Sequence, residues 1–570
     1  MVNDLLRTAW LLIVATVLLR AFSADRRGVF GDPIARLALI ARATLVTVIA
    51  VNILARLHIL NAATLLAAIL AWSATRWLIR YNWAAGHAVR MVMREWTIGM
   101  VRRLEQHGSI DLRRQWPNIA RRTVLGRVTS MRRQLDRLPH RSAMLAATTA
   151  AGLAVAGYLR VQPVLGDLRL GDPDAYAILL SARRALFDAP EGFVPVTSAV
   201  AAALSCASSL NPLHVVRLTG PIIGLSLVIA CAGLVRCATR EPTAGVMTLW
   251  VLGGYPFGIA KYTDGGGEFA RVLRQALTRQ WCPGDLEVAV LFLVLGAIAI
   301  AMRRPASSTT AAACVAAAAL AQPLILLLLV PVVLLHAVMP YRAAFLASMA
   351  VCSCIAAAAV AGAGDAARTI ALTLPITIAL TAGALYALAT ALVRQFAGAQ
   401  VEYALASTVA CALVVLVPRT NGALYLEHPV TPQKTLEIVS NLPRGKWLIV
   451  APVEQLAEAF GRGWYEEPSA FVDRYAQRVA DPDFSFDFAV DDLLVFVEKR
   501  PFKTFAAEPP EVPFSRLADP SYRHYRSLAG RASLQARLFA LCEAYGRSHH
   551  GASVYYDDEQ LTIFRFRVRG

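Results

Sequence analysis

Long apolar segments recur along most of this chain, with short polar or basic stretches between them. Each segment has the roughly 17–25 residues that a helix needs to cross about 30 Å of hydrocarbon. They lie at about 8–23, 36–56, 60–79, 143–160, 213–235, 243–259, 286–302, 309–339, 342–362, 369–393 and 401–417. The pattern therefore predicts a mostly α-helical, polytopic membrane protein with eleven or twelve transmembrane helices, depending on whether 309–339 crosses once or twice.

Composition supports this class. The apolar residues make up 56% of the chain and the mean hydropathy is +0.49, values that exclude an ordinary soluble protein. The net charge of +18 would raise the question of nucleic acid in a soluble protein. Here cytoplasmic loops that face anionic lipid explain it, because such loops collect Lys and Arg. We expect a multi-pass protein of the cell inner (cytoplasmic) membrane, with membrane lipid and no nucleic acid as a partner.

The N-terminal part combines three apolar segments with a basic block. Residues 1–80 are expected to form a three-helix membrane segment. Its first apolar run is longer than a usual signal-peptide core, so we interpret it as a retained anchor. Residues 81–142 interleave many arginines with apolar residues such as Trp96 and Ile98. They are predicted to form amphipathic helices on the inner membrane face, or alternatively a docking site for a cytoplasmic partner.

The basic block also sets the expected topology. If it is cytoplasmic, the segment 143–160 runs outward and the loop 161–212 lies on the outer side. The loop 260–284 then faces outward as well. This topology requires that 193–210 does not cross and that 309–339 folds as two short helices around Gln322 and Pro323. If 309–339 crosses once instead, the C-terminal domain changes sides.

After Pro418 the hydrophobic pattern changes and predicts a soluble α/β domain over 418–570. Alternating and continuous apolar runs predict its elements. Strands are expected at 446–452 and 491–499, helices at 453–464 and 532–546, and a hairpin over 552–568 that turns at 557–560. No glycine-rich phosphate loop and no GxSxG sequence occurs in this part of the chain.

Cysteine and histidine positions indicate no metal or disulfide framework. Most of the nine cysteines lie in or beside apolar segments, where Cys acts as a small hydrophobic residue. The pair Cys352 and Cys354 has no partners at zinc spacing. We interpret His214 as a packing residue, and the pair at 549–550 lies in a predicted surface loop.

The candidate chemistry lies in two acidic loops on the expected outer side. In the first, RLGDPDAYAILLSARRALFD (169–188), Asp172 and Asp174 precede a predicted helix over 175–187. In the second, Asp264 and Glu268 flank glycines 265–267, which allow a sharp turn. Acidic residues are sparse in the apolar part of the chain, so these two loops are the first candidates for a functional site.

The order of these features resembles the GT-C superfamily of integral membrane glycosyltransferases, which use polyprenyl-phosphate-linked sugars. The resemblance covers about 143–417 and implies a GT-C-like transmembrane core with the external loops 161–212 and 260–284. It is carried by GDPDAY (171–176), NPLHVVRLTGPIIGLSLVIACAGLVR (211–236), GGYPFGIAKYTDGGGE (253–268) and AALAQPLILLLLVPVVLLH (318–336). It implies a cell-envelope enzyme that transfers a sugar to an acceptor on the outer side of the membrane.

The resemblance also implies roles for single residues. Asp172 or Asp174 would be the general base that takes the acceptor proton. Asp264 would orient the acceptor or, in family members that need one, hold a divalent metal ion, so the metal requirement stays open. The implied substrate-binding residues include arginines that grip phosphate oxygens. They are Tyr176, Arg183, Arg184, Glu268 and Arg271.

Simpler explanations exist for the same residues. Asp172 or Asp174 can cap a helix, Arg183 and Arg184 can anchor an interfacial helix at lipid headgroups, and Asp264 with Glu268 can form a solvated turn. The motif is Asp-Pro-Asp where the family often has an adjacent acidic pair. A second function therefore stays open: a non-catalytic GT-C-like scaffold that binds protein partners through 81–142 and 418–570. A transporter fits less well, because the spans carry almost no charge.

Overall fold

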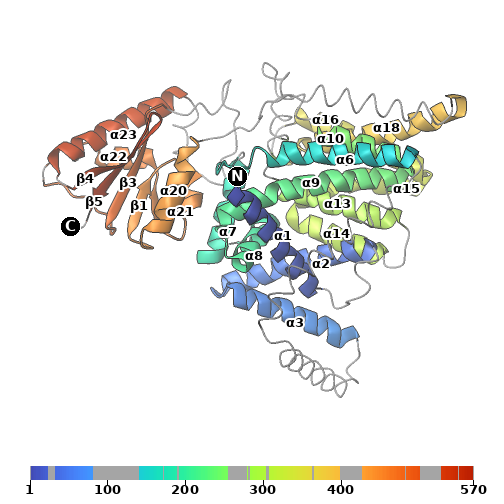
Figure 1. Ribbon diagram of the computed structural model, residues 1–570, viewed down its shortest axis with the longest axis horizontal. Coiled ribbons are helices and arrows are strands. Elements are labelled where there is room, and N and C mark those ends of the chain that lie inside the picture. Colours follow the sequence, from blue (N-terminus) through green and yellow to red (C-terminus); the bar gives the residue numbers. More distant parts are fainter. Residues whose placement is uncertain are drawn as a thin grey trace.

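The structure is a computed structural model, and its described residues are the following. They are 2–22, 33–80, 140–170, 173–188, 192–254, 283–302, 307–362, 365–397, 427–452, 454–479, 483–500, 528–549 and 551–568, with the single residues 190, 276, 279 and 481. Within them, a bundle of apolar helices is joined at one end to a smaller α/β domain (Figure 1). The mostly helical class that the hydrophobic pattern predicts is confirmed.

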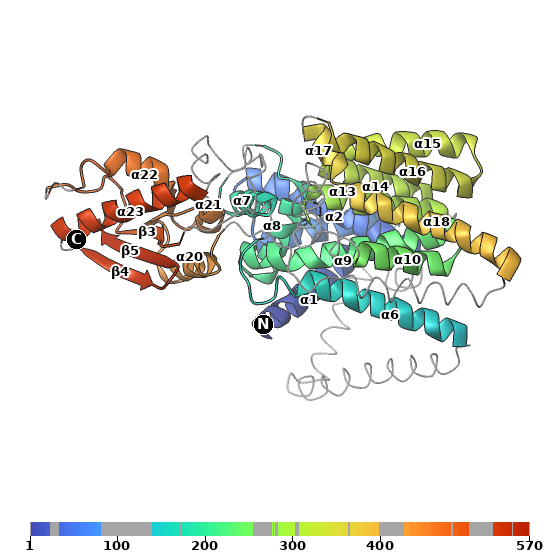
Figure 2. The same cartoon turned by 90° about the horizontal axis from the view of Figure 1, so that it is seen from above.

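The apolar helices form the larger part of the molecule, and most of them run side by side along its longest axis (Figure 2). They are α1 (Val2–Phe22), α2 (Pro33–Arg56), α3 (Ala62–Arg80), α6 (His140–Val161), α9 (Pro212–Thr239), α10 (Pro242–Gly253), α13 (Asp285–Ala301), α14 (Ser307–Ala321), α15 (Leu329–Val338), α16 (Tyr341–Val360), α17 (Asp365–Ala371) and α18 (Leu374–Ala397). Two further helices, α7 (Pro173–Phe187) and α8 (Val196–Ser208), lie at the end nearest the α/β domain (Figure 2).

Five helices of the described residues are long and apolar enough to cross a membrane, fewer than the eleven or twelve spans expected. They are Val2–Phe22, Ile34–Arg56, Pro212–Thr239, Tyr341–Val360 and Ala366–Leu392. Several other apolar helices are shorter than the roughly 20 residues that a span needs: α10 has 12 residues and α14 has 15. The segment 401–417 lies outside the described residues. Five such helices are consistent with a membrane protein.

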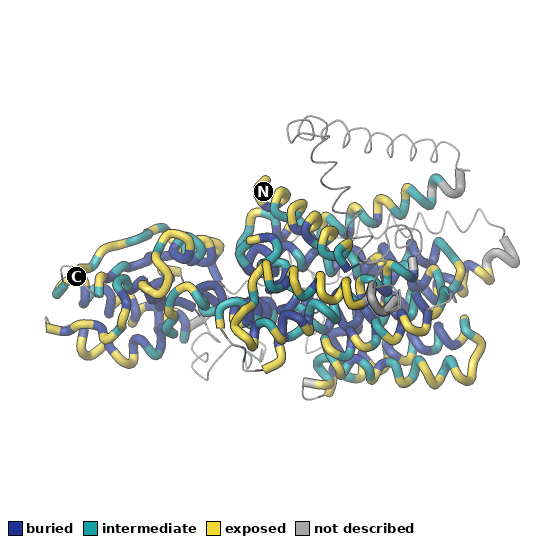
Figure 3. The backbone as a smooth tube through the Cα atoms, turned by 90° about the horizontal axis from the view of Figure 1, so that it is seen from below, coloured by how far each residue is buried: buried dark blue, intermediate teal, exposed yellow. Residues whose placement is uncertain are grey.

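The surface of the bundle suits a lipid environment. Exposed residues follow the outer faces of the helices, while buried residues fill the interior (Figure 3). Many of the exposed side chains are large and apolar, for example Val333 at 64% and Leu334 at 62% exposure. In water such a surface would drive association, whereas in a bilayer it contacts lipid tails.

The structure bears on the two segments that the expected topology depends on, and it shows the break in 309–339. Helix α14 ends at Ala321, and the chain continues as the 3-10 helix η3 (Pro323–Leu328) and then α15. Proline disfavours a helical residue before it and lacks an N–H group, which explains the break. Helix α8 begins and ends at one end of the bundle. Near its start, the hydroxyl of Thr197 donates to Asp285, the first residue of α13, at 2.8 Å. After its end, the chain leads directly to Asn211, which caps the start of α9.

This end of the bundle, which we call the loop end, collects buried arginines. It is the end where α6 and α10 finish and where α9 and α13 begin. Arg160 in α6 donates to the carbonyls of Leu252 and Gly253 at 3.1 Å and closes the end of α10. Arg217 in α9 pairs with Asp4 of α1 at 2.6 Å. Because a buried charge needs a partner, these contacts hold the helix ends together.

The α/β domain is built on a five-stranded sheet with the order β2-β1-β3-β5-β4. The strands are β1 (Trp447–Val450), β2 (Trp464–Glu466), β3 (Asp492–Glu498), β4 (Ala552–Asp557) and β5 (Leu561–Arg567). Strand β1 is parallel to β2 and β3, and β5 is antiparallel to β3 and β4. One face is covered by α20 (Val430–Asn441) and α21 (Glu454–Ala459), the other by α22 (Pro468–Tyr475) and α23 (Leu528–Ser548).

Most elements predicted for this domain are confirmed. The strands at 446–452 and 491–499, the helix at 532–546 and the hairpin that turns at 557–560 all occur. The prediction of one helix over 453–464 is wrong, because α21 ends at Ala459 and β2 begins at Trp464. Gly461 has a φ of +77°, and a side chain at Gly463 would collide with Trp447. These two glycines end the helix and let β2 lie beside β1.

Replacing Asp4 by Asn should destabilise the bundle by about 3–5 kcal/mol, because Arg217 would stay buried without its counter-ion. The side chain of Arg217 is 1% exposed, whereas that of Arg7, which also contacts Asp4, is 35% exposed. Thermal unfolding in detergent should show a clear loss for Asp4→Asn and little change for Arg7→Ala. Equal losses in the two variants would contradict a special role for the buried pair.

Candidate functional site

The first acidic loop leads directly into α7, and the predicted helix over 175–187 is confirmed. Pro173 is the first residue of α7, a position that suits proline because its missing N–H has no partner there. Asp174 lies in the first turn, where a negative charge complements the positive end of the helix dipole. The simpler explanation, that this carboxylate stabilises a helix start, therefore holds for Asp174. Asp172 lies outside the described residues.

Asp174 also belongs to a charge cluster at the loop end, which we call the Asp174 cluster (Asp174, Arg279 and Glu287). Its Oδ2 lies 2.7 Å from Nη1 of Arg279, and Nε of Arg279 lies 2.7 Å from Oε1 of Glu287. Glu287 also accepts the N–H of Gly284 at 2.7 Å. The side chains of Arg279 and Glu287 are 9% and 5% exposed, but that of Asp174 is 35% exposed. Asp174 is thus the member that solvent or a substrate can reach.

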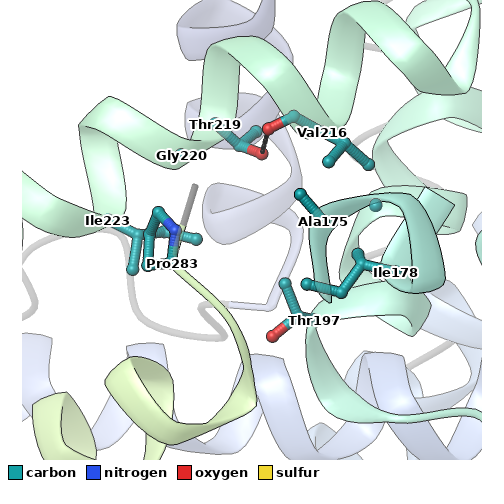
Figure 4. A pocket seen from close by; sticks show the side chains of 9 residues that line it. Ala175, Ile178, Thr197, Val216, Thr219, Gly220, Ile223 and Pro283 are labelled. Atoms are coloured by element: carbon teal, nitrogen blue, oxygen red, sulfur yellow. Dashed lines mark hydrogen bonds between the residues drawn. The ribbon is translucent and has the colours of Figure 1, made fainter. Parts of the chain in front are cut away.

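A small apolar pocket is lined by Ala175, the residue that follows Asp174 in α7 (Figure 4). The empty space between its lining side chains is about 270 Å³ when open solvent is included, so the hollow itself is far smaller than the roughly 300–1,000 Å³ of typical small-molecule sites. Its walls come from α7, α8, α9 and the residue before Gly284, and they carry no charged side chain. The lining residues are Ala175, Ile178, Thr197, Ala201, Val216, Thr219, Gly220, Ile223 and Pro283. The hollow has room for no more than a group of about the size of a methyl or a water molecule.

The described part of the site does not fit a divalent metal ion. No group of three His, Cys, Asp or Glu side chains in the described residues is arranged to hold one. The guanidinium of Arg279 bonds to both Asp174 and Glu287, so a cation already occupies the place where a metal would need oxygen ligands. Asp264, the residue that the family resemblance connects with a metal, lies outside the described residues.

Tyr176, predicted to bind substrate, is buried against the α/β domain. Its side chain has no exposed surface. The hydroxyl donates to Oε1 of Glu427 and accepts the N–H of Leu170 at 3.2 Å. The other carboxylate oxygen of Glu427 accepts the amide N–H of Gln455. In this structure Tyr176 therefore contributes to a domain interface and offers no surface to a substrate.

The two arginines of α7 contact the same domain. Arg183 is 1% exposed and donates to the carbonyl of Phe460 at 3.2 Å and to the side chain of Asn211 at 3.0 Å. Arg184 is exposed, and its guanidinium lies 5.8 Å from the centre of the Phe460 ring. These contacts join α7 to α9 and α21, and they engage the guanidinium groups that were predicted to bind phosphate.

The end of α7 packs closely against the domain. A Cβ added at Gly461 would lie 2.6 Å from Cβ of Phe187, so only glycine fits there. The guanidinium groups of Arg444 and Arg462 lie 5.6 Å and 5.7 Å from the centre of the Phe187 ring, within the range of cation–π attraction. The α/β domain thus contacts α7 from its first turns to its last residue.

Three glutamates are fully buried at this interface: Glu427, Glu454 and Glu458. Neither carboxylate oxygen of Glu458 has a hydrogen-bond partner among the described residues. Burial raises the pKa of Glu458 to about 8, against the opposing effect of Arg183 and with a further rise from Glu454. Burial, together with the other two glutamates, also raises the pKa of Glu427 well above its usual range. The neutral carboxyl group is the form of Glu458 that fits this environment.

The sequence predicted some of these residues and missed others. Asp264, Glu268 and Arg271 lie outside the described residues. Arg279 and Glu287 were not selected, although an arginine beside a span and a glutamate inside its first turn both need partners. Glu427 carries no local signal, because its partner Tyr176 is 251 residues away in the chain.

No family model matches this chain, and no curated protein matches it either. The fold and the site are therefore described from the contacts of this chain alone. They define a protein with an apolar helix bundle whose acidic motif begins the helix that binds the α/β domain.

The interface between α7 and the α/β domain should weaken as the pH rises. The pKa of Glu458 is about 8 in the folded protein and about 4.3 in an unfolded chain. The folded state therefore binds more protons between these values. The stabilisation is fully present below about pH 4 and is lost towards pH 8, at up to about 1.4 kcal/mol per pH unit.

Urea unfolding of the full chain in detergent, followed at several pH values, measures this slope. Glu458→Gln should remove this part of the pH dependence, because the amide stays neutral. Glu498→Gln is the matched control, since Glu498 is equally buried but paired with Arg531 away from α7. It should lower stability and leave the slope unchanged. A slope that Glu458→Gln does not alter would contradict the protonated state of Glu458.

Proposed function

We propose that this chain is a membrane glycosyltransferase that moves a sugar from a polyprenyl-phosphate donor to an acceptor hydroxyl on the outer side of the cytoplasmic membrane. The observation that carries the proposal is the Asp174 cluster, in which a buried arginine holds a partly exposed carboxylate next to an apolar pocket. A polar sugar on an apolar carrier needs both environments side by side. The GT-C resemblance of the surrounding motifs favours the same activity.

In the proposed reaction Asp174 is the general base. The acceptor oxygen attacks the anomeric carbon of the donor while the bond from that carbon to the phosphate oxygen breaks. The acceptor proton passes to Asp174, and the bonding electrons leave with polyprenyl phosphate.

The departing phosphate needs a cation that the cluster does not supply. Arg183 is buried and bonded to Phe460. Arg184 lies ten residues after Asp174 in α7, a distance of about 15 Å along the helix, which is too far to contact the same phosphate. Of the arginines that the family resemblance implies for phosphate binding, we propose Arg271, which lies outside the described residues.

A non-catalytic scaffold is the second candidate function. It is favoured by Tyr176, Arg183 and Arg184, because the side chains predicted to bind substrate contact the α/β domain instead. A protein that kept the fold for assembly would retain such an interface and lose the chemistry. The α/β domain and the block 81–142 would then bind protein partners.

Replacing Asp174 by Asn should lower sugar transfer by about 10²- to 10⁴-fold, the contribution typical of a general base. The assay uses full-length protein in liposomes and follows the release of polyprenyl phosphate from donors that carry mannose, glucose, galactose or arabinose. Asp188→Asn is the matched control, because Asp188 is an exposed aspartate at the other end of α7, and it should retain activity.

The outcomes separate the two functions. Transfer by the wild-type protein that Asp174→Asn abolishes supports the enzyme. Equal transfer by Asp174→Asn and wild type contradicts the role of Asp174 as base. If the wild-type protein uses none of the donors, the enzyme is contradicted and the scaffold is favoured.

A further inference from the structure

Both flanks of the first acidic motif are tied to a single residue of the α/β domain, Glu427. Before the motif, Nη1 of Arg169 donates to the backbone carbonyl of Glu427 at 3.2 Å. After it, the hydroxyl of Tyr176 donates to the Glu427 carboxylate. The same hydroxyl accepts the N–H of Leu170 at 3.2 Å. These bonds join Leu170 and Tyr176 to each other and Tyr176 to the domain, on either side of Asp174 in the sequence.

Glu427 is itself held from the domain side. It is fully buried, and its second carboxylate oxygen accepts from Gln455 of α21. The amide oxygen of Gln455 accepts the hydroxyl of Thr435 in α20 at 2.7 Å. A buried polar group that loses its partner is costly, so this chain of bonds fixes Glu427 relative to two helices of the domain.

Other contacts hold α7 further along. Arg183 bonds to Phe460, and Phe187 packs against Gly461. These residues lie in the second half of the helix, away from Asp174. Among the described residues of α7, Tyr176 is therefore the one nearest to Asp174 whose side chain bonds to the α/β domain.

We infer that Glu427 is a positioning residue, and that through Tyr176 it fixes the Asp174 carboxylate against Arg279 and the apolar pocket. Tyr176 follows Asp174 by two residues in the same helical turns. A shift of the helix start therefore moves the Asp174 oxygen away from Arg279, which lies 2.7 Å from it. The effect on sugar transfer rests on the proposed function, whereas the tie between domain and motif does not.

The tie is tested with Tyr176→Phe, which removes one hydroxyl and keeps the buried ring. Tyr475→Phe is the matched control, because Tyr475 is equally buried and donates its hydroxyl to Asp487 inside the α/β domain. Amide hydrogen exchange of the full-length protein in detergent is the readout. Residues 165–180 should exchange faster in Tyr176→Phe and as in wild type in Tyr475→Phe. This measurement needs no substrate.

The effect on chemistry is measured with the donor that the wild-type protein uses. Tyr176→Phe and Glu427→Ala should lower kcat by about 10- to 100-fold, the scale of a displacement of about 1 Å, with KM unchanged. Glu427→Gln keeps the side-chain shape and one oxygen that can accept from Tyr176, but its amide N–H faces that of Gln455, so it should restore only part of the kcat that Glu427→Ala loses. A merely structural role would not predict this rescue. Tyr475→Phe should have the wild-type kcat.

The results decide the inference and the proposed function separately. Faster exchange at 165–180 together with the loss and rescue of kcat supports the positioning role. Unchanged exchange in both Tyr176→Phe and Glu427→Ala overturns the tie, whatever the activity. Faster exchange with wild-type kcat overturns the positioning role, while the Asp174→Asn result still tests the base. If the wild-type protein transfers no sugar, the proposed function fails and exchange alone decides the tie.

Discussion

An arginine buried in an apolar bundle must reach oxygen acceptors, and four arginines meet this requirement at the loop end. Arg160, Arg183, Arg217 and Arg279 are all less than a tenth exposed. Each bonds to a second element: the end of α10, the end of α21, the start of α1 and the start of α7. An unpaired buried charge costs several kcal/mol, so these helix ends have one stable arrangement. The pairing that stabilises the bundle thereby also places the carboxylate that we propose as the base.

The α/β domain belongs to this arrangement and is not a separate appendage. It contacts α7 through buried carboxyl groups, a tyrosine hydroxyl and aromatic packing, so the acidic motif is held from the bundle on one side and from the domain on the other. This contact places the domain at the loop end of the bundle. The cost is the burial of Glu427 and Glu458, whose raised pKa values make the interface sensitive to pH.

The hydrophobic pattern of the sequence predicted those features that depend on residues close together in the chain. Hydrophobic periodicity predicted the helical class and most of the sheet, because these follow from neighbouring residues. The expected positions of the basic residues required the break at Gln322 and Pro323. The hydrophobic pattern overcounted the spans, because hydropathy does not distinguish a full span from a 12-residue helix such as α10. It found Asp174 but neither Arg279 nor Glu427, because those contacts join residues 105 and 251 positions apart in the chain.

The central claim is that the acidic motif and the α/β domain form one unit on one side of the membrane. Single cysteines in a background without reactive thiols, labelled in sealed vesicles with a membrane-impermeant maleimide, test it directly. Three exposed positions serve: Asp188 at the end of α7, Glu559 in the hairpin turn, and Arg240 after the far end of α9. Cysteines at 188 and 559 should react from the same side and one at 240 from the other. Reaction of 188 and 559 from opposite sides would contradict the claim.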